Sequence, residues 1–222
     1  MTVPGVATKY AAQLIAARMK TRLALLAIAI LLSSSRSADA TGQAKLYLAF
    51  GTSETVGVGI PPGGAYPLVF ARQCGLSPFV IASPGASNVP AWPDRLPRIF
   101  SLFISPNYVL FRRMRTNERR LTALLVEAHR RRVPGIIVLP PATSRLAAFM
   151  PSSRDVADEE EMRRYIRTLV NDSLRLIDLS TLPRDSRDLL RDGLHPSIRG
   201  QARIAAELYK VARSMKMCER MP

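Results

Sequence analysis

The chain is poor in the residues that mark several common classes of protein. Aromatic residues make up 6% of its 222 residues, and it has one tryptophan, two histidines and two cysteines. Cys74 and Cys218 lie too far apart to form the paired spacing of a zinc or redox motif, so the sequence predicts no metal site and no cofactor. The two cysteines either pair or remain free thiols, because a sequence does not show whether their Cα atoms come close.

The sequence also lacks an apolar run of the roughly 20 residues that a bilayer requires. Its longest run, residues 23–32, follows three basic residues and precedes an A-x-A sequence that ends at Ala40. This order is typical of a cleaved export signal. We therefore predict a signal peptide over residues 1–40, with translation starting at Met19, and one secreted or periplasmic domain over residues 41–222.

Acidic residues are outnumbered, with 17 Asp and Glu against 32 Lys and Arg, for a formal charge of +15. Without residues 1–40 the charge remains +11. Arginines cluster within residues 112–132, but no aromatic residues interleave with them and no nucleic-acid-binding motif is present. We expect a solvated basic face or electrostatic attraction to an anionic cell envelope, and no nucleic-acid partner.

Short apolar runs alternate with amphipathic patterns of helical period. This alternation predicts an α/β fold, a three-layer α/β/α flavodoxin-like sandwich with a mainly parallel five-stranded sheet, whose functional groups gather at the carboxyl ends of the strands. The expected strands cover residues 45–50, 79–82, 108–111, 136–139 and 174–179. The expected helices cover residues 66–74, 118–133, 158–169 and 197–215.

Two patterns carry candidate chemistry. Ser53 follows the first strand through Gly51, and a small residue there lets the chain turn and present the serine hydroxyl above the sheet. Asp192 lies three residues before His195, just ahead of the last helix, and a histidine base needs an acceptor for its second ring nitrogen. The patterns predict Ser53 as nucleophile and His195, oriented by Asp192, as base. The alternatives are an ordinary strand-end serine and a histidine that only packs in a capping loop.

Together, GTSETVG at residues 51–57 and DGLHPSIRGQARIA at residues 192–205 resemble the first and last sequence blocks of the SGNH (GDSL-type) hydrolases. The resemblance extends from Lys45 to the last helix. It implies a catalytic triad of Ser53, Asp192 and His195. It also implies an oxyanion hole formed by the backbone N–H groups of Ser53 and Gly85 and by the side chain of Asn117.

Other readings remain open at these positions. Thr52 stands where the family usually has aspartate, and Arg115 replaces the glycine of its third block. Asn117 could instead cap a helix that starts at Glu118, and Asn88 is a second candidate for the oxyanion hole.

The resemblance implies hydrolysis of acyl esters through an acyl-Ser53 intermediate, without metal or cofactor. The expected substrate is an acyl-ester small molecule, an acylated glycan or a lipid, and the expected state is a monomer. Acyl transfer to envelope glycans and a non-catalytic envelope-binding role are the alternatives. Loops over residues 57–64, 86–98 and 142–157 are expected to shape the pocket. Trp92 is either a platform for a sugar or acyl group or packed beneath its loop.

Overall fold

The computed structural model describes residues 45–108, 114–142, 152–182 and 185–218, which belong to one compact unit of residues 43–222. The predicted signal peptide lies outside the described residues. None of the described helices is both long and apolar enough to span a membrane. In chain order the strands and α-helices are β1 (Leu46–Gly51), α2 (Ser53–Val56), α3 (Tyr66–Cys74), β2 (Ser77–Ala82), β3 (Ile99–Phe103), α4 (Met114–Arg130), β4 (Gly135–Leu139), α5 (Ser153–Thr168), β5 (Leu174–Asp178) and α6 (Ile198–Ser214).

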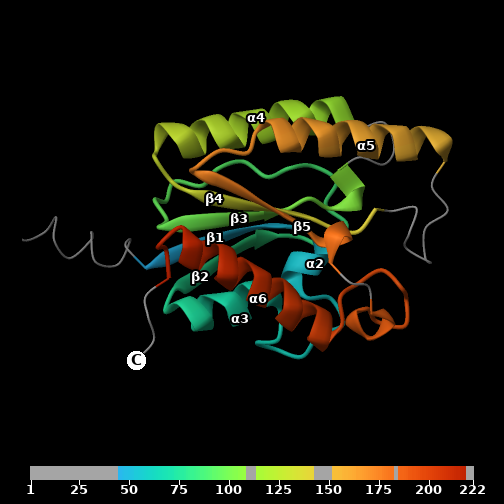
Figure 1. Ribbon diagram of the computed structural model, residues 1–222, viewed down its shortest axis with the longest axis horizontal. Helices are drawn as coiled ribbons and strands as arrows, with labels where there is room; N and C mark the ends of the chain where they lie inside the picture. The colour runs from blue at the N-terminus through green and yellow to red at the C-terminus, as the bar shows by residue number, and fades with distance from the viewer. Residues whose placement is uncertain (1–44, 109–113, 143–151, 183–184, 219–222) are drawn as a thin grey trace, which may run out of the picture. The chain divides into compact units, whose positions relative to one another are not determined.

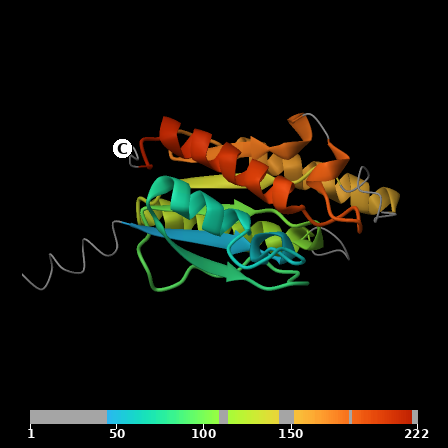
Figure 2. The same ribbon diagram turned by 90° about the horizontal axis from the view of Figure 1, so that it is seen from below.

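The strands form one five-stranded sheet in the order β2-β1-β3-β4-β5, and every neighbouring pair is parallel. Helices α4 and α5 cover one face of the sheet, and α3 and α6 cover the other (Figure 1, Figure 2). The predicted three-layer α/β/α sandwich with a five-stranded parallel sheet is therefore confirmed. All five carboxyl ends lie along one edge of the sheet, because the strands run in the same direction.

Strand β1, which lies between β2 and β3, is buried on both faces. Tyr47 and Ala49 pack into the core beneath α3 and α6, whereas Leu48 and Phe50 pack into the core beneath α4 and α5. Successive side chains of a strand point to opposite faces, so a strand covered on both sides needs apolar residues at every position. This burial explains the continuous apolar run that marks the first strand in the sequence.

The third strand differs from the prediction. The third strand was expected at residues 108–111, but β3 is Ile99–Phe103, and all five of its residues are buried. Tyr108 lies in a 3-10 helix, and residues 109–111 lie outside the described residues. Pro106 lies within the apolar stretch that follows β3 and cannot donate to a sheet ladder. The chain turns there into a short 3-10 helix, Pro106–Tyr108, so the strand forms before the proline rather than after it.

Helix α4 also begins earlier than predicted, since it already includes Met114. Met114, Asn117, Leu121 and Leu124 are all buried and recur at spacings of three and four residues. The inward-facing stripe of the helix therefore extends one turn before Glu118. Asn117 lies inside the helix, so the alternative prediction that it caps the helix is wrong.

No α-helix separates β2 from β3, and the proline-rich segment of residues 83–98 crosses the sheet in its place. Trp92 of this segment packs against Phe50 and Phe100, with ring centroids 5.7 and 5.4 Å apart. The Arg95 guanidinium lies 4.4 Å from the centre of the Phe79 ring. Trp92 thus packs beneath its loop, and the alternative of a ligand platform does not hold.

A disulfide joins Cys74, at the end of α3, to Cys218, beyond α6, with the Cα atoms 4.5 Å apart. Of the two alternatives left by the sequence, the structure contains the paired form. The bond closes a ring with a sequence separation of 144 residues. A ring of this length removes much of the conformational freedom of the unfolded chain.

Replacing both cysteines in a Cys74→Ser/Cys218→Ser variant should lower the free energy of unfolding by about 2–5 kcal/mol, because the unfolded chain regains that freedom. Denaturant unfolding followed by circular dichroism measures the difference. A reducing agent should destabilise the natural chain by a similar amount and leave the double variant unchanged. Equal stability of the oxidised natural chain and the variant would contradict this expectation.

Candidate functional site

Ser53 is the first residue of α2, two residues beyond the end of β1. The turn requires glycine at position 51, because a Cβ atom there would lie 1.9 Å from the Thr55 hydroxyl oxygen. The Thr55 hydroxyl is in turn 3.0 Å from that of Tyr66, within hydrogen-bond distance. The predicted nucleophile therefore lies in a tight turn at the carboxyl edge of the sheet. Ser53 is 8% exposed there.

Glu54 is a buried carboxylate that sequence reasoning missed. Its Oε2 atom accepts a hydrogen bond of 2.5 Å from the Thr52 hydroxyl and one of 3.3 Å from the Ser53 hydroxyl. The glutamate is 5% exposed, and no lysine, arginine or histidine of the described residues lies within ion-pair distance of it. The one feature of the sequence that could have pointed to Glu54 is its place directly after the candidate nucleophile.

His195 and Asp192 form the hydrogen-bonded pair that the sequence predicts. The His195 Nδ1 atom lies 2.7 Å from the Asp192 Oδ2 atom. The other carboxylate oxygen, Oδ1, accepts the backbone N–H groups of Leu194 at 2.8 Å and His195 at 3.0 Å. Gly193 has a φ of 66°, which the tight turn between them requires. Because a carboxylate only accepts hydrogen bonds, it fixes the imidazole proton on Nδ1 and leaves Nε2 as the basic nitrogen.

The environment keeps Asp192 ionised. Its partial burial raises the pKa of the carboxyl, but the hydrogen bonds from the His195 ring and from the backbone N–H groups of Leu194 and His195 outweigh burial. The pKa of Asp192 therefore lies below its usual value. An ionised partner stabilises the imidazolium that forms when His195 takes up a proton.

The turn that carries His195 is fixed to the start of α6. The Leu190 N–H donates to the His195 carbonyl at 2.8 Å, and the Ser197 N–H donates to the Asp188 carbonyl at 2.8 Å. Gly200 of α6 is so close to this loop that a Cβ atom would lie 2.0 Å from the Asp188 carbonyl oxygen. These backbone contacts fix the loop that carries His195, in addition to the hydrogen bond that the His195 side chain makes with Asp192.

Gln201 links this region to the nucleophile. Its side chain is fully buried; its Nε2 donates to the Glu54 carbonyl at 3.0 Å, and its Oε1 accepts the Tyr66 N–H at 2.8 Å. One side chain on the first turns of α6 therefore joins α2, α3 and α6. The structure thereby anchors the segments that carry Ser53 and His195 to each other. No hydrogen bond joins the Ser53 hydroxyl to His195 among the described contacts.

Two of the predicted oxyanion donors have backbone N–H groups without a partner in the described part of the chain. Within the described residues, neither the Ser53 nor the Gly85 backbone N–H donates a hydrogen bond. Gly85 lies in an exposed turn after β2 with a φ of 71° and no neighbouring atom within 4 Å of the Cβ position, so a ligand can approach its backbone closely. Strands β1 and β2 are neighbours, and both donors follow their carboxyl ends.

The third predicted donor, Asn117, does not fit. Its Nδ2 donates to the carbonyls of Ser87 and Tyr108, at 2.9 and 2.7 Å, and its Oδ1 accepts the Val89 N–H at 2.9 Å. Both amide hydrogens are therefore used, and the side chain is fully buried. Asn117 holds the proline-rich segment against α4 and has no hydrogen left for an oxyanion.

Asn107 is the first asparagine after the third strand as the structure has it. It follows β3 in the 3-10 helix of residues 106–108, is partly exposed, and its side-chain amide donates no hydrogen bond within the described residues. Asn107 was not a candidate in the sequence, because the third strand was expected at residues 108–111 and the asparagine was sought after that strand. The second candidate of the sequence, Asn88, is exposed in the proline-rich segment. Among the described residues, no cluster of His, Cys, Asp and Glu side chains could hold a metal ion.

Comparison with known proteins finds similarity in structure but not in sequence. No protein-family model matches the chain, and no curated protein sequence matches it. The lipase Lip_vut3 from a goat rumen metagenome superposes with a TM-score of 0.58 at 17% identity, over 78% of this chain and 98% of that one. A putative lipolytic protein of the G-D-S-L family from Desulfitobacterium hafniense gives 0.59 at 14% identity, over 75% and 99%. The acetyl xylan esterase AlAXEase gives 0.55 at 16% identity, over 75% and 98%.

These proteins share the layered architecture on which the site is built. Each of the three is covered almost entirely, so the likeness concerns the whole domain rather than one motif. The described part of the chain therefore has the SGNH (GDSL-type) hydrolase fold.

Proposed function

We propose that the protein is a serine hydrolase of carboxylic esters, with Ser53 as nucleophile, His195 as base and Asp192 as its orienting acid. One observation carries the proposal: a turn-held serine and a carboxylate-paired histidine, at opposite ends of the sequence, are anchored to each other by Gln201 at the carboxyl edge of the sheet. A nucleophile, a base and a group that orients the base are the parts that acyl transfer requires.

The reaction begins when the Ser53 hydroxyl turns from Glu54 to the Nε2 atom of His195, which takes its proton as the oxygen attacks the ester carbonyl. The developing oxyanion accepts hydrogen bonds from the backbone N–H groups of Ser53 and Gly85 and from the Asn107 side chain. His195 then gives the proton to the departing alcohol. Water, activated by the same histidine, releases the acid from Ser53.

The names of the neighbouring structures, lipase and acetyl xylan esterase, support ester bonds as the target. Export is also part of the proposal. A disulfide persists in oxidising compartments, which agrees with the signal peptide predicted over residues 1–40 and a secreted or periplasmic site of action. The exposed arginines of α4, among them Arg115, Arg119 and Arg120, support attraction to an anionic envelope.

A Ser53→Ala variant should lose at least about 10⁴-fold in kcat on p-nitrophenyl acetate, because no other group can form the acyl intermediate. A fluorophosphonate probe should label the natural chain at Ser53 and leave the variant unlabelled. Ser214→Ala, at the far end of α6, is the matched control and should retain full activity. Undiminished turnover by Ser53→Ala would refute the assignment.

An Asp192→Asn variant should lose about 10²–10⁴-fold in kcat, because its amide can no longer accept the Nδ1 proton and the imidazole adopts the wrong tautomer. Initial rates at saturating ester measure the loss. Asp172→Asn provides the control, since the Asp172 side chain is fully exposed. Equal rates for the Asp192→Asn and Asp172→Asn variants would contradict the role of Asp192 as the residue that orients His195.

The two asparagines should separate catalysis from stability. Asn107→Ala should lower kcat about 10²–10³-fold with little change in unfolding, because it removes an oxyanion donor. Asn117→Ala should lower the free energy of unfolding by about 2–4 kcal/mol, because it leaves buried backbone groups of residues 87, 89 and 108 unpaired. Parallel kinetics and denaturant unfolding decide the roles, and the reverse pattern would restore Asn117 to the oxyanion hole.

A further inference from the structure

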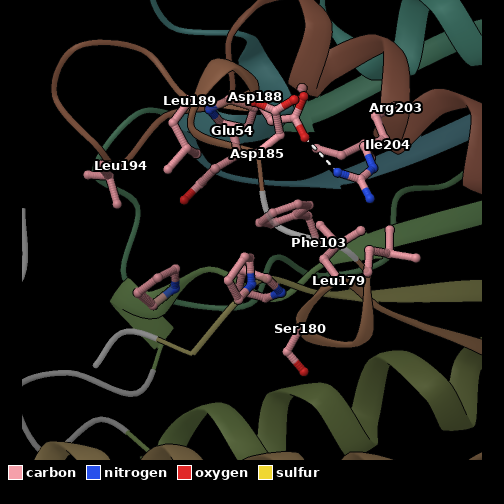
Figure 3. Close-up of a pocket in the computed structure, with 16 residues that line it drawn as sticks. Glu54, Phe103, Leu179, Ser180, Asp185, Asp188, Leu189, Leu194, Arg203 and Ile204 are labelled. Carbon is pink, nitrogen blue, oxygen red and sulfur yellow. Dashed lines mark hydrogen bonds and ion pairs between the residues drawn. The ribbon is translucent and has the colours of Figure 1, made fainter. Parts of the chain in front are cut away.

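A cavity of about 180 Å³ opens at the carboxyl edge of the sheet, beside the proposed triad. Its wall is built from the ends of β3, β4 and β5, the loop that carries His195, and the first turns of α6. Figure 3 shows Phe103, Leu179, Leu189, Leu194 and Ile204 around it. No described residue of the loops 57–64, 86–98 and 142–157, which the sequence suggested for shaping the pocket, lines this cavity, and residues 143–151 lie outside the described part of the chain.

The cavity adjoins the segments that carry the reacting groups. Glu54, the residue after Ser53, lies in its wall, and so do Leu194 and Pro196, on either side of His195. Pro106, the residue before the oxyanion candidate Asn107, lines it as well. The cavity is therefore a neighbour of the nucleophile, the base and the oxyanion candidate, whose sequence neighbours form part of its wall.

The chemistry of the wall selects an apolar occupant. Its three acidic residues are already engaged: Asp188 with Arg203 at 2.6 Å, Asp185 with Arg199 at 2.7 Å, and Glu54 with the hydroxyls of Thr52 and Ser53. The hydroxyl of Ser180 donates to Asp178. A sugar needs several free donors and acceptors and often an aromatic platform, and Trp92 packs against the other face of the sheet. The remaining wall is leucine, isoleucine, phenylalanine and proline.

We propose that this cavity binds the hydrocarbon chain of the acyl group, so that the substrates are esters of short- to medium-chain fatty acids rather than acetylated glycans. The proposal rests on the proposed function, because it takes Ser53 as the attacking group. The acyl half of the ester remains on Ser53 after the alcohol leaves. A cavity that starts beside α2 therefore holds the same chain through both steps of the reaction.

The first experiment compares p-nitrophenyl esters from acetate to decanoate. The value of kcat/KM should rise by up to about fourfold for each added methylene, the factor that burial of one CH₂ produces, until the cavity is full. A flat or falling series overturns the proposal. A series of acetate esters with lengthening alcohols should show no such rise, and a rise there instead assigns the cavity to the alcohol and also overturns it.

Two substitutions at Leu179 test the wall itself. Leu179→Trp should lower kcat/KM for octanoate relative to acetate at least tenfold, because the indole fills the cavity. Leu179→Ala should move the preferred acyl chain to a greater length. Val126→Trp, on the exposed face of α4, is the matched control and should keep the natural profile. Unchanged chain-length profiles in both Leu179 variants contradict the assignment.

Binding separates failure of this proposal from failure of the proposed function. Methyl octanoate should bind the Ser53→Ala variant in calorimetry more tightly than methyl acetate does, and Leu179→Trp in the same background should abolish the difference. If fluorophosphonate does not label Ser53, the proposed function fails and this binding measurement still decides the cavity. Equal binding of the two methyl esters overturns the cavity assignment even where Ser53 is labelled.

Discussion

The two hydrogen bonds of Gln201 are the interaction on which the geometry of the site depends. The nucleophile comes from the first strand and the base from the last loop, about 140 residues apart, and neither segment contacts the other through a regular element. Gln201 accepts from the start of α3 and donates to the carbonyl in α2, while α6 carries it at a fixed distance from His195. Its amide is buried, so each lost bond would leave a backbone group without a partner.

The candidate site contains two carboxylates, Asp192 and Glu54, whose surroundings differ. Asp192 has its two oxygens divided between backbone and imidazole, so the residue that shapes the turn also orients the base. Glu54 is deeper, without a cation of the described residues within ion-pair distance, and is held by two hydroxyls. The first stabilises positive charge on His195. The second accepts a hydrogen bond from the Ser53 hydroxyl. Environment, rather than residue type, separates the two roles.

The sequence predicted what local chemistry determines. Asp192 and His195, for example, pair across a single turn. Asn107, the asparagine that we propose as an oxyanion donor, was not predictable in this way, because its place depends on where β3 ends. Asn117 lies in an apolar stripe that looks like a helix start, and only tertiary packing shows that three backbone groups occupy its amide. Glu54 was missed because burial of a charged side chain leaves no periodic signal.

The disulfide has a consequence for how the molecule resists force. Its covalent ring runs from Cys74 to Cys218 and encloses β2 to β5 together with the histidine loop. Strand β1 and Ser53 lie in the tail outside this ring, although β1 lies within the sheet between β2 and β3 (Figure 1). Tension on the amino-terminal end is therefore borne by the two hydrogen-bonded ladders of β1 and by Gln201, not by the covalent bond. Withdrawal of β1 would take Ser53 with it and separate β2 from β3, while the covalent ring would still join these two strands.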